Sequence, residues 1–104
     1  MATADLTVIA LGRQELSASE YIAEIQRRLR AQTRVRFEMH AMGTSLEGAT
    51  EDILAIVGEL HAVPFEQGVQ RVYTVLKLDE RRDRPGQTLD DKVRSVERRL
   101  GGEL

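Results

Sequence analysis

Side chains able to bind a ligand or transfer a proton gather between residues 38 and 47, where Glu38, His40, Ser45 and Glu47 occur together, and Tyr73 lies on a later apolar segment. A carboxylate pairs with a cation and accepts its hydrogen bonds, and an aromatic ring face attracts positive charge. Beside apolar walls these side chains suit a flat, cationic, hydrogen-bonding ligand. A polar contact between subunits would use the same residues, so both interpretations stay open.

No catalytic or metal-binding constellation is predicted. His40 and His61 have no third ligand at a recognisable spacing, so a metal site is not expected. The chain has no cysteine, which excludes a thiolate zinc site and thiol catalysis. No Gly-x-Ser-x-Gly nucleophile motif occurs. We therefore predict a protein that is not an enzyme and that needs no cofactor.

Composition limits the classes of partner. The chain has 104 residues, which predicts one domain spanning residues 1–104. The net charge is −2, so the charge balance gives no attraction to the phosphates of nucleic acids. Apolar runs are short and the first residues do not resemble a secretion signal, so we expect a cytosolic protein with no membrane partner.

The first and last strands of the predicted sheet are apolar and β-branched. Residues 6–11 are apolar on both faces, which is typical of a strand in the middle of a sheet. Residues 69–78 form the last strand. The charged segment 79–86 after it is expected to be a loop.

A hairpin is predicted between these strands. From Val35 to Ala41 apolar and polar residues alternate, which indicates a half-buried strand. Gly43 interrupts this alternation, and residues 44–48 continue in an extended pattern. We expect the two segments to pair through a turn at residues 41–44.

Two helices carry recognisable start signals. Ser17 and Glu20 match a capping box, and Thr88 with Asp91 resembles another cap before the last helix. The first helix has one apolar stripe, and the last helix has a narrow one. The stripes consist of Tyr21, Ile22, Ile25 and Leu29 in the first helix, and of Leu89, Val93, Val96 and Leu100 in the last.

The middle helix is expected to begin with Thr50 as its cap. Glu51 and Asp52 follow in the first turn, where the helix dipole favours negative charge. Pro64 lacks a backbone N–H, so the helix is expected to kink or end near it, and at the latest at Gly68.

The element order predicts an α+β, ferredoxin-like βαββαβ antiparallel sheet with two helices on one face and a C-terminal helix added. We expect Val8, Phe37, Leu46 and Val72 to lie under the helices. Alternation then places the following residues on the other face of the sheet: Ile9, Leu11, Glu38, His40, Ser45, Glu47, Tyr73, Val75 and Lys77.

Two apolar surfaces would then need a cover. The aliphatic and aromatic side chains on the open sheet face form one, and the stripe of the last helix forms the other. A soluble chain seldom leaves such surfaces in water, so we expect self-association as a dimer or tetramer.

Several motifs together resemble the YkoF-like thiamine-binding protein family. The similarity is carried by residues 37–48 and 68–83, and it includes the Met42-Gly43-Thr44 turn, Glu47-Gly48, Arg81-Arg82-Asp83 and the helix at 91–97. Two departures are Ala41, where the family usually has proline, and Pro64, where a helix-forming residue is usual.

The resemblance implies a ferredoxin-like subunit that forms dimers and tetramers and binds thiamine, or its hydroxymethylpyrimidine part, between subunits without catalysis. It favours the Met42-Gly43-Thr44 turn, Glu47 and the segment from Asp79 to Arg82 as the ligand site. The complete set of predicted site residues is Glu38, His40, Met42, Gly43, Thr44, Glu47, Tyr73, Asp79 and Arg82.

The leading hypothesis is a carrier, buffer or sensor of thiamine or the related pyrimidine. Glu47 would balance the thiazolium charge, so Glu47→Gln is expected to weaken binding of the cation more than binding of the neutral fragment. A regulatory module whose open face serves only oligomerisation or partner docking is the alternative, and an enzyme of the dimeric α+β barrel type is a third.

Overall fold

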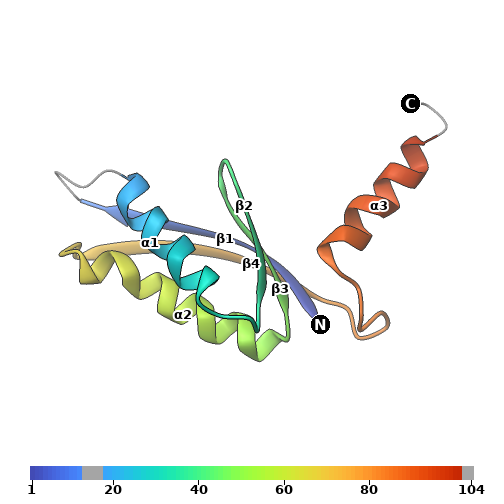
Figure 1. The fold of residues 1–104 in the computed structure, drawn as a ribbon, viewed down its shortest axis with the longest axis horizontal. Coiled ribbons are helices and arrows are strands. Elements are labelled where there is room, and N and C mark those ends of the chain that lie inside the picture. Colours follow the sequence, from blue (N-terminus) through green and yellow to red (C-terminus); the bar gives the residue numbers. More distant parts are fainter. Residues whose placement is uncertain (13–17, 102–104) are drawn as a thin grey trace.

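The protein, described by a computed structural model for residues 1–12 and 18–101, is a four-stranded antiparallel sheet with three helices (Figure 1). The strand order is β2-β3-β1-β4, which is the order of a ferredoxin-like fold, and α3 is added after it. The predicted fold class is thus confirmed. The elements are β1 (Ala2–Leu11), α1 (Ala18–Arg30), β2 (Arg36–His40), β3 (Gly43–Gly48), α2 (Thr50–Glu66), β4 (Arg71–Glu80) and α3 (Leu89–Leu100).

One face of the sheet, the helix face, is covered by α1 and α2 (Figure 1). Alternate residues of β1 point to this face, from Ala2 to Ala10, and all five of them are buried. Leu29 of α1 and Leu60 of α2 are completely buried against them. The core therefore lies in a single layer between the helices and the sheet.

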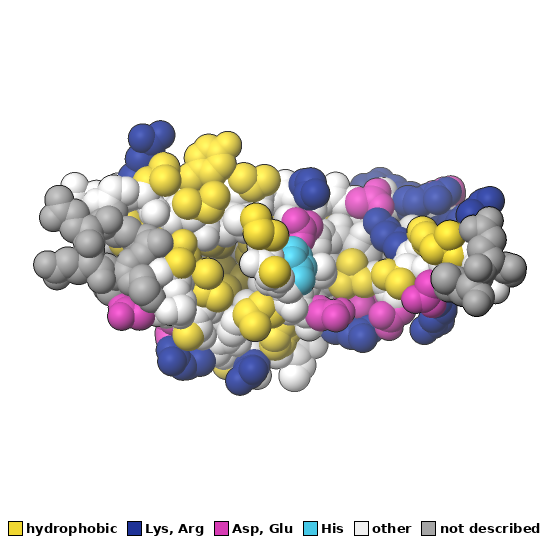
Figure 2. All heavy atoms as spheres, turned by 90° about the horizontal axis from the view of Figure 1, so that it is seen from above, with side chains coloured by type: hydrophobic (Ala, Val, Ile, Leu, Met, Phe, Trp, Pro, Cys, Tyr) yellow, Lys and Arg dark blue, Asp and Glu magenta, His cyan; other side chains and the backbone are white. Residues whose placement is uncertain are grey.

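The predicted placement of Val8, Phe37, Leu46 and Val72 under the helices is confirmed. Phe37 pairs with Leu46, and Leu46 pairs with Ala4, so these residues share the helix face. Val72 pairs with Ala10 on the same face. The opposite side, the open face, carries hydrophobic side chains over the strands, as the space-filling view shows (Figure 2).

The start of α2 differs from the prediction. Ala49 is the N-cap, and Thr50 is the first helical residue and makes no cap bond. The Thr50 hydroxyl instead donates to the carboxylate of Glu80 at the end of β4. The predicted cap was wrong because a tertiary contact takes the hydroxyl that would have served the helix. The predicted acidic first turn, with Glu51 and Asp52, is confirmed.

Pro64 lies within the last turn of α2, which ends two residues later at Glu66. Gly68 then takes a φ of 88°, a conformation that glycine adopts without strain. The expected termination near this proline is confirmed. The capping box expected at Ser17 lies outside the described residues.

The hairpin is tighter and the last strand ends later than expected. Only Ala41 and Met42 link β2 to β3, so Gly43 belongs to the strand rather than to the turn. A Cβ atom at Gly43 would lie 2.5 Å from the carbonyl oxygen of Leu6, so β1 approaches too closely for any side chain there. The strand β4 continues to Glu80, so the expectation that the loop begins at residue 79 was wrong.

The first turn of α3 is held against the open face. Arg36 Nη1 donates to Glu47 Oε1 and to Asp90 Oδ2, each at 3.1 Å, and Lys92 donates to the carboxylate of Asp79. The hydrogen bond to Asp90 is the main reason why the pKa of Arg36 is raised. The remainder of α3 points away from the sheet (Figure 1).

The cap predicted before α3 is confirmed, and the structure shows it to be a capping box. Thr88 Oγ1 accepts from the Asp91 N–H at 3.1 Å, and Asp91 Oδ2 accepts from the Thr88 N–H at 2.9 Å. The hydrogen bond from the Thr88 backbone N–H holds the pKa of the Asp91 carboxyl below its usual value.

Candidate ligand-binding site

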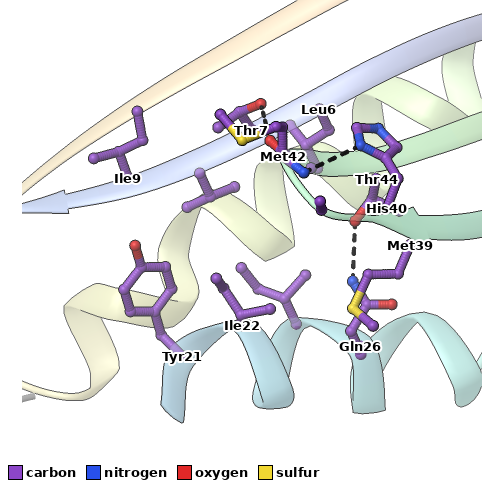
Figure 3. A pocket seen from close by; sticks show the side chains of 14 residues that line it. Leu6, Thr7, Ile9, Tyr21, Ile22, Gln26, Met39, His40, Met42 and Thr44 are labelled. Carbon is purple, nitrogen blue, oxygen red and sulfur yellow. Dashed lines mark hydrogen bonds between the residues drawn. The ribbon is translucent and has the colours of Figure 1, made fainter. Parts of the chain in front are cut away.

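A pocket forms where one strand of the sheet stops early. The pairing of β1 with β3 ends at Leu6 and Thr44, whereas its pairing with β4 continues to Leu11 and Arg71. The last five residues of β1 therefore have no neighbouring strand on that edge. The cavity beside them, of about 530 Å³, is bounded by β1, by α1 and by the β2–β3 turn (Figure 3).

The lining is mainly apolar. It consists of Leu6, Thr7, Val8, Ile9, Tyr21, Ile22, Ile25, Gln26, Met39, His40, Ala41, Met42, Gly43 and Thr44. None of these fourteen residues is Asp, Glu, Lys or Arg. A pocket with such walls and a few hydrogen-bonding groups suits a small, largely neutral molecule.

Three hydrogen bonds fix the β2–β3 turn at one end of the pocket. Thr7 Oγ1 donates to the Met42 carbonyl at 3.1 Å, and the Met42 N–H donates to His40 Nδ1 at 3.3 Å. The other ring nitrogen of His40 lies 2.7 Å from Asp5 Oδ1. Because Nδ1 accepts, Nε2 carries the proton and donates to the carboxylate.

The opposite wall comes from α1. Gln26 Nε2 donates to Thr44 Oγ1 at 3.0 Å, which leaves the threonine proton free to donate and the Gln26 carbonyl free to accept. The Ala10 N–H donates to the hydroxyl of Tyr21 at 3.3 Å, so this N–H points to the unpaired edge of β1. Backbone groups two residues apart in a strand point to the same edge, so the N–H and C=O of Val8 also face the pocket.

The structure brings four of the predicted site residues together. His40, Met42, Gly43 and Thr44 all line the pocket. Thr44 pairs with Leu6, points to the helix face and is 5% exposed, so it lies on the opposite side of the sheet from Glu47.

The other predicted site residues lie elsewhere. Glu47 and Asp79 flank Thr3 on the open face beneath the first turn of α3, and their carboxylates pair with Arg36 and Lys92 respectively. Arg82 lies beyond the end of β4, where its Nε donates to Glu80 at 2.9 Å.

Glu38 and Tyr73 are both exposed, and both lie on the open face. Glu38 pairs with Ser45, and Tyr73 pairs with Ile9. The predicted site residues therefore fall into separate groups. The group at the β2–β3 turn lines the cavity of about 530 Å³, and Asp79 lines a smaller one of about 350 Å³.

Sequence reasoning missed the residues that α1 and β1 contribute. Tyr21 and Ile22 were assigned to an apolar helix stripe, and Thr7 and Gln26 were given no role. Gln26 follows Ile22 by four residues and so continues the apolar stripe with a polar side chain. The polar side chain of Gln26 at a position that faces the core was therefore the available indication of a binding site on α1.

In the described part of the chain, no group of three or more His, Asp or Glu side chains is placed to hold a metal ion. Within those same residues, no helix has the length and apolar character needed to cross a bilayer.

Residues 4–97 match the family described as thiamine-binding protein. The chain belongs to this family. The UPF0045 protein YqgV of Bacillus subtilis is 36% identical over 103 residues, which cover 96% of this chain and 98% of YqgV. A UPF0045 protein of Methanothermobacter thermautotrophicus is 41% identical over 101 residues, covering 96% of this chain and all of that protein.

Solved structures agree with the fold of this family member. The MJ1052 protein of Methanocaldococcus jannaschii superposes with a TM-score of 0.78 at 32% identity, over 99% of this chain and 97% of its own. A Thermotoga maritima protein assigned provisionally to thiamine biosynthesis or salvage superposes with a TM-score of 0.73 at 24% identity, over 91% of this chain and 97% of its own.

Proposed function

We propose that this protein binds thiamine or its hydroxymethylpyrimidine part, without catalysis, in the pocket between α1, β1 and the β2–β3 turn, and that it acts as a cytosolic carrier, buffer or sensor. The observation that carries the proposal is an apolar cavity of about 530 Å³, with hydrogen-bonding groups at its edges, in a chain of the thiamine-binding family. This volume lies within the range of small-molecule sites.

The pyrimidine ring is the part of thiamine that this pocket fits. An aminopyrimidine presents an amino donor beside a ring-nitrogen acceptor, and the C=O and N–H of Val8 offer the complementary acceptor and donor. The Thr44 hydroxyl and the Gln26 carbonyl supply further partners on the other side. The flat ring would lie between apolar side chains such as Ile22 and Met39.

The thiazolium cation fits the interior less well, because the lining holds no carboxylate. Glu47, the predicted counter-charge, already pairs with Arg36, and its side chain is only 6% exposed. In our proposal the cationic ring therefore lies at the mouth of the pocket. The neutral pyrimidine should then bind about as tightly as thiamine itself.

The test is calorimetric titration of hydroxymethylpyrimidine and thiamine into ligand-free protein, using Ile22→Trp and Leu54→Trp. Ile22 lines the pocket, and an indole there would fill it. Leu54 is exposed on α2 and does not line it, so its variant is the matched control. We expect Ile22→Trp to abolish binding and Leu54→Trp to retain it. Absence of heat with either compound on the unsubstituted protein would refute the proposal.

An interaction module remains the second candidate, because α3 exposes an apolar stripe that its own sheet does not cover. Val93 and Val96 are each 57% exposed. Lack of ligand binding combined with stable self-association would favour this function over the first.

A further inference from the structure

The imidazole of His40 connects a carboxylate on the open face with the turn that walls the pocket. Its Nε2 lies 2.7 Å from Asp5 Oδ1, and its Nδ1 accepts the Met42 N–H at 3.3 Å. Figure 3 shows the ring beside the turn, with a dashed line joining its nitrogen to Met42. One ring therefore makes both contacts.

The β2–β3 turn supplies one wall of the pocket, since residues 39–43 all line it. The Met42 side chain is 80% exposed, so its packing contributes little to holding the turn. Hydrogen bonds hold its backbone instead, from Thr7 at the carbonyl and to His40 at the N–H. The shape of this wall therefore depends on those two bonds.

The two contacts of His40 respond differently to a proton. Histidine is the side chain that gains charge between about pH 8 and pH 5. The His40 side chain is 40% exposed, so a proton from solvent can reach Nδ1. Once protonated, Nδ1 donates and no longer accepts, whereas Nε2 keeps its proton and its hydrogen bond to Asp5 gains charge. Protonation therefore removes the contact with Met42 and strengthens the contact with Asp5.

We infer that His40 is a positioning residue that makes the pocket sensitive to pH, because uptake of a proton at Nδ1 sets two donors against each other and releases the Met42 N–H. The Asp5 carboxylate keeps the ring in place, so the backbone of the turn moves. Thr7 alone then holds Met42. The wall loosens, and affinity for the ligand falls on acidification, a consequence that rests on the proposed function.

The charged groups around His40 keep the protonated ring where it is. On the open face Glu38 lies two residues earlier on β2, Asp5 lies on β1, and Lys77 lies opposite Asp5 on β4. The position opposite Glu38 on β3 is the uncharged Ser45. On the pocket side, α1 contributes no charged side chain to the lining. The added positive charge thus meets two carboxylates and one ammonium group, and the ring is not repelled from its site.

The expected effect is the loss of one hydrogen bond to a neutral acceptor. A bond of this kind changes an equilibrium constant by a factor of roughly 2–10. We therefore expect the dissociation constant of the ligand to rise about three- to tenfold when His40 is protonated. By reciprocity, ligand binding to partly protonated protein releases a proton.

The two histidines of the chain provide a matched pair of substitutions. His40→Asn keeps an acceptor oxygen near the Met42 N–H at every pH, because a side-chain amide does not titrate in this range. His61→Gln is the control, since His61 contacts Thr74 from α2 and does not line the pocket.

The first measurement is calorimetric titration of hydroxymethylpyrimidine at about pH 8 and pH 5 into the unsubstituted chain, His40→Asn and His61→Gln. Any proton that the free compound takes up affects all three proteins alike, so affinities are compared between proteins at each pH. On acidification we expect the unsubstituted chain and His61→Gln to lose about three- to tenfold more affinity than His40→Asn. Equal losses in all three proteins overturn the inference.

The second measurement needs no ligand. NMR spectroscopy of the unsubstituted chain from about pH 8 to pH 5 follows the His40 ring and the Met42 N–H. We expect both signals to change with one midpoint, and the Met42 N–H to exchange faster with solvent once the ring is charged. A Met42 signal that stays constant while the ring is protonated overturns the inference, as does a ring that stays neutral throughout. If hydroxymethylpyrimidine binds none of the proteins, the proposed thiamine binding fails, and the NMR signals still decide the role of His40.

Discussion

Replacing Gly43 by alanine tests whether the close approach of β1 to β3 shapes the pocket. The added Cβ would lie 2.5 Å from the Leu6 carbonyl oxygen and 3.0 Å from Thr7 Oγ1. Backbone must therefore move, and Thr7 is the residue that anchors the turn through its bond to Met42. We expect the substitution to destabilise the fold and to weaken ligand binding together.

The magnitude follows from a comparison with Gly58, which lies within α2 where an added Cβ would meet no atom within 4 Å. Alanine restricts the unfolded chain at either position, which stabilises the protein by about 0.4–1 kcal/mol. At Gly58 this gain remains, and it is the main cause of the better helix propensity of alanine. At Gly43 forced displacement costs about 1–3 kcal/mol, the usual range for overpacking.

The assay is urea unfolding of both variants at one protein concentration, together with titration of hydroxymethylpyrimidine. We expect Gly43→Ala to be less stable than Gly58→Ala by about 1–3 kcal/mol. The melting temperatures would then differ by roughly 4–20 °C. If Gly43→Ala is as stable as Gly58→Ala and binds ligand normally, the steric argument is refuted.

Three further predictions concern α3 and its anchor on the sheet. Thr88→Ala should lower the free energy of unfolding by about 1 kcal/mol through loss of the cap, whereas Thr88→Ser should keep most of it; equal losses would contradict the capping role. The pKa of Asp91 is lowered in the folded state, so the stabilisation by its carboxylate is complete above the unfolded pKa of about 3.9 and is lost as pH falls through the folded pKa. In urea unfolding from pH 6 to pH 2, the free energy of unfolding should therefore decline less for Asp91→Asn than for the unsubstituted chain. Identical declines would argue against this role of Asp91. Because Arg36 occupies the Glu47 carboxylate, Glu47→Gln should change the affinities for thiamine and for the neutral pyrimidine equally; selective loss of thiamine in calorimetry would restore Glu47 as the counter-charge.

The layers of the fold were predictable because the signals are local. Alternation in residues 36–40 fixes which side of β2 is buried, and Phe37 lies on the helix face as that alternation requires. The Thr88 capping box involves residues only three positions apart, so it too could be recognised. At Thr50 the same type of signal failed, because its hydroxyl binds Glu80, thirty residues away.

The pocket was not predictable in the same way. It exists because β3 pairs with only the first part of β1, and strand lengths relative to one another are set by tertiary pairing rather than by local pattern. Grouping the candidate residues by motif placed Thr44 with Glu47. Side chains three positions apart in a strand point to opposite faces of the sheet, so these two residues cannot share one site face. The polar Gln26 in the α1 stripe was the remaining indication.

The bridge made by Arg36 has a consequence for assembly of the chain. Arg36 belongs to β2, an edge strand of the sheet, and it reaches Asp90 of α3 only when β2 is paired in its native register. A shift of one residue would turn the guanidinium to the opposite side of the sheet and leave the last helix without that anchor. Docking of α3 on the sheet through Arg36 therefore requires that the β2–β3 hairpin is paired in its native register.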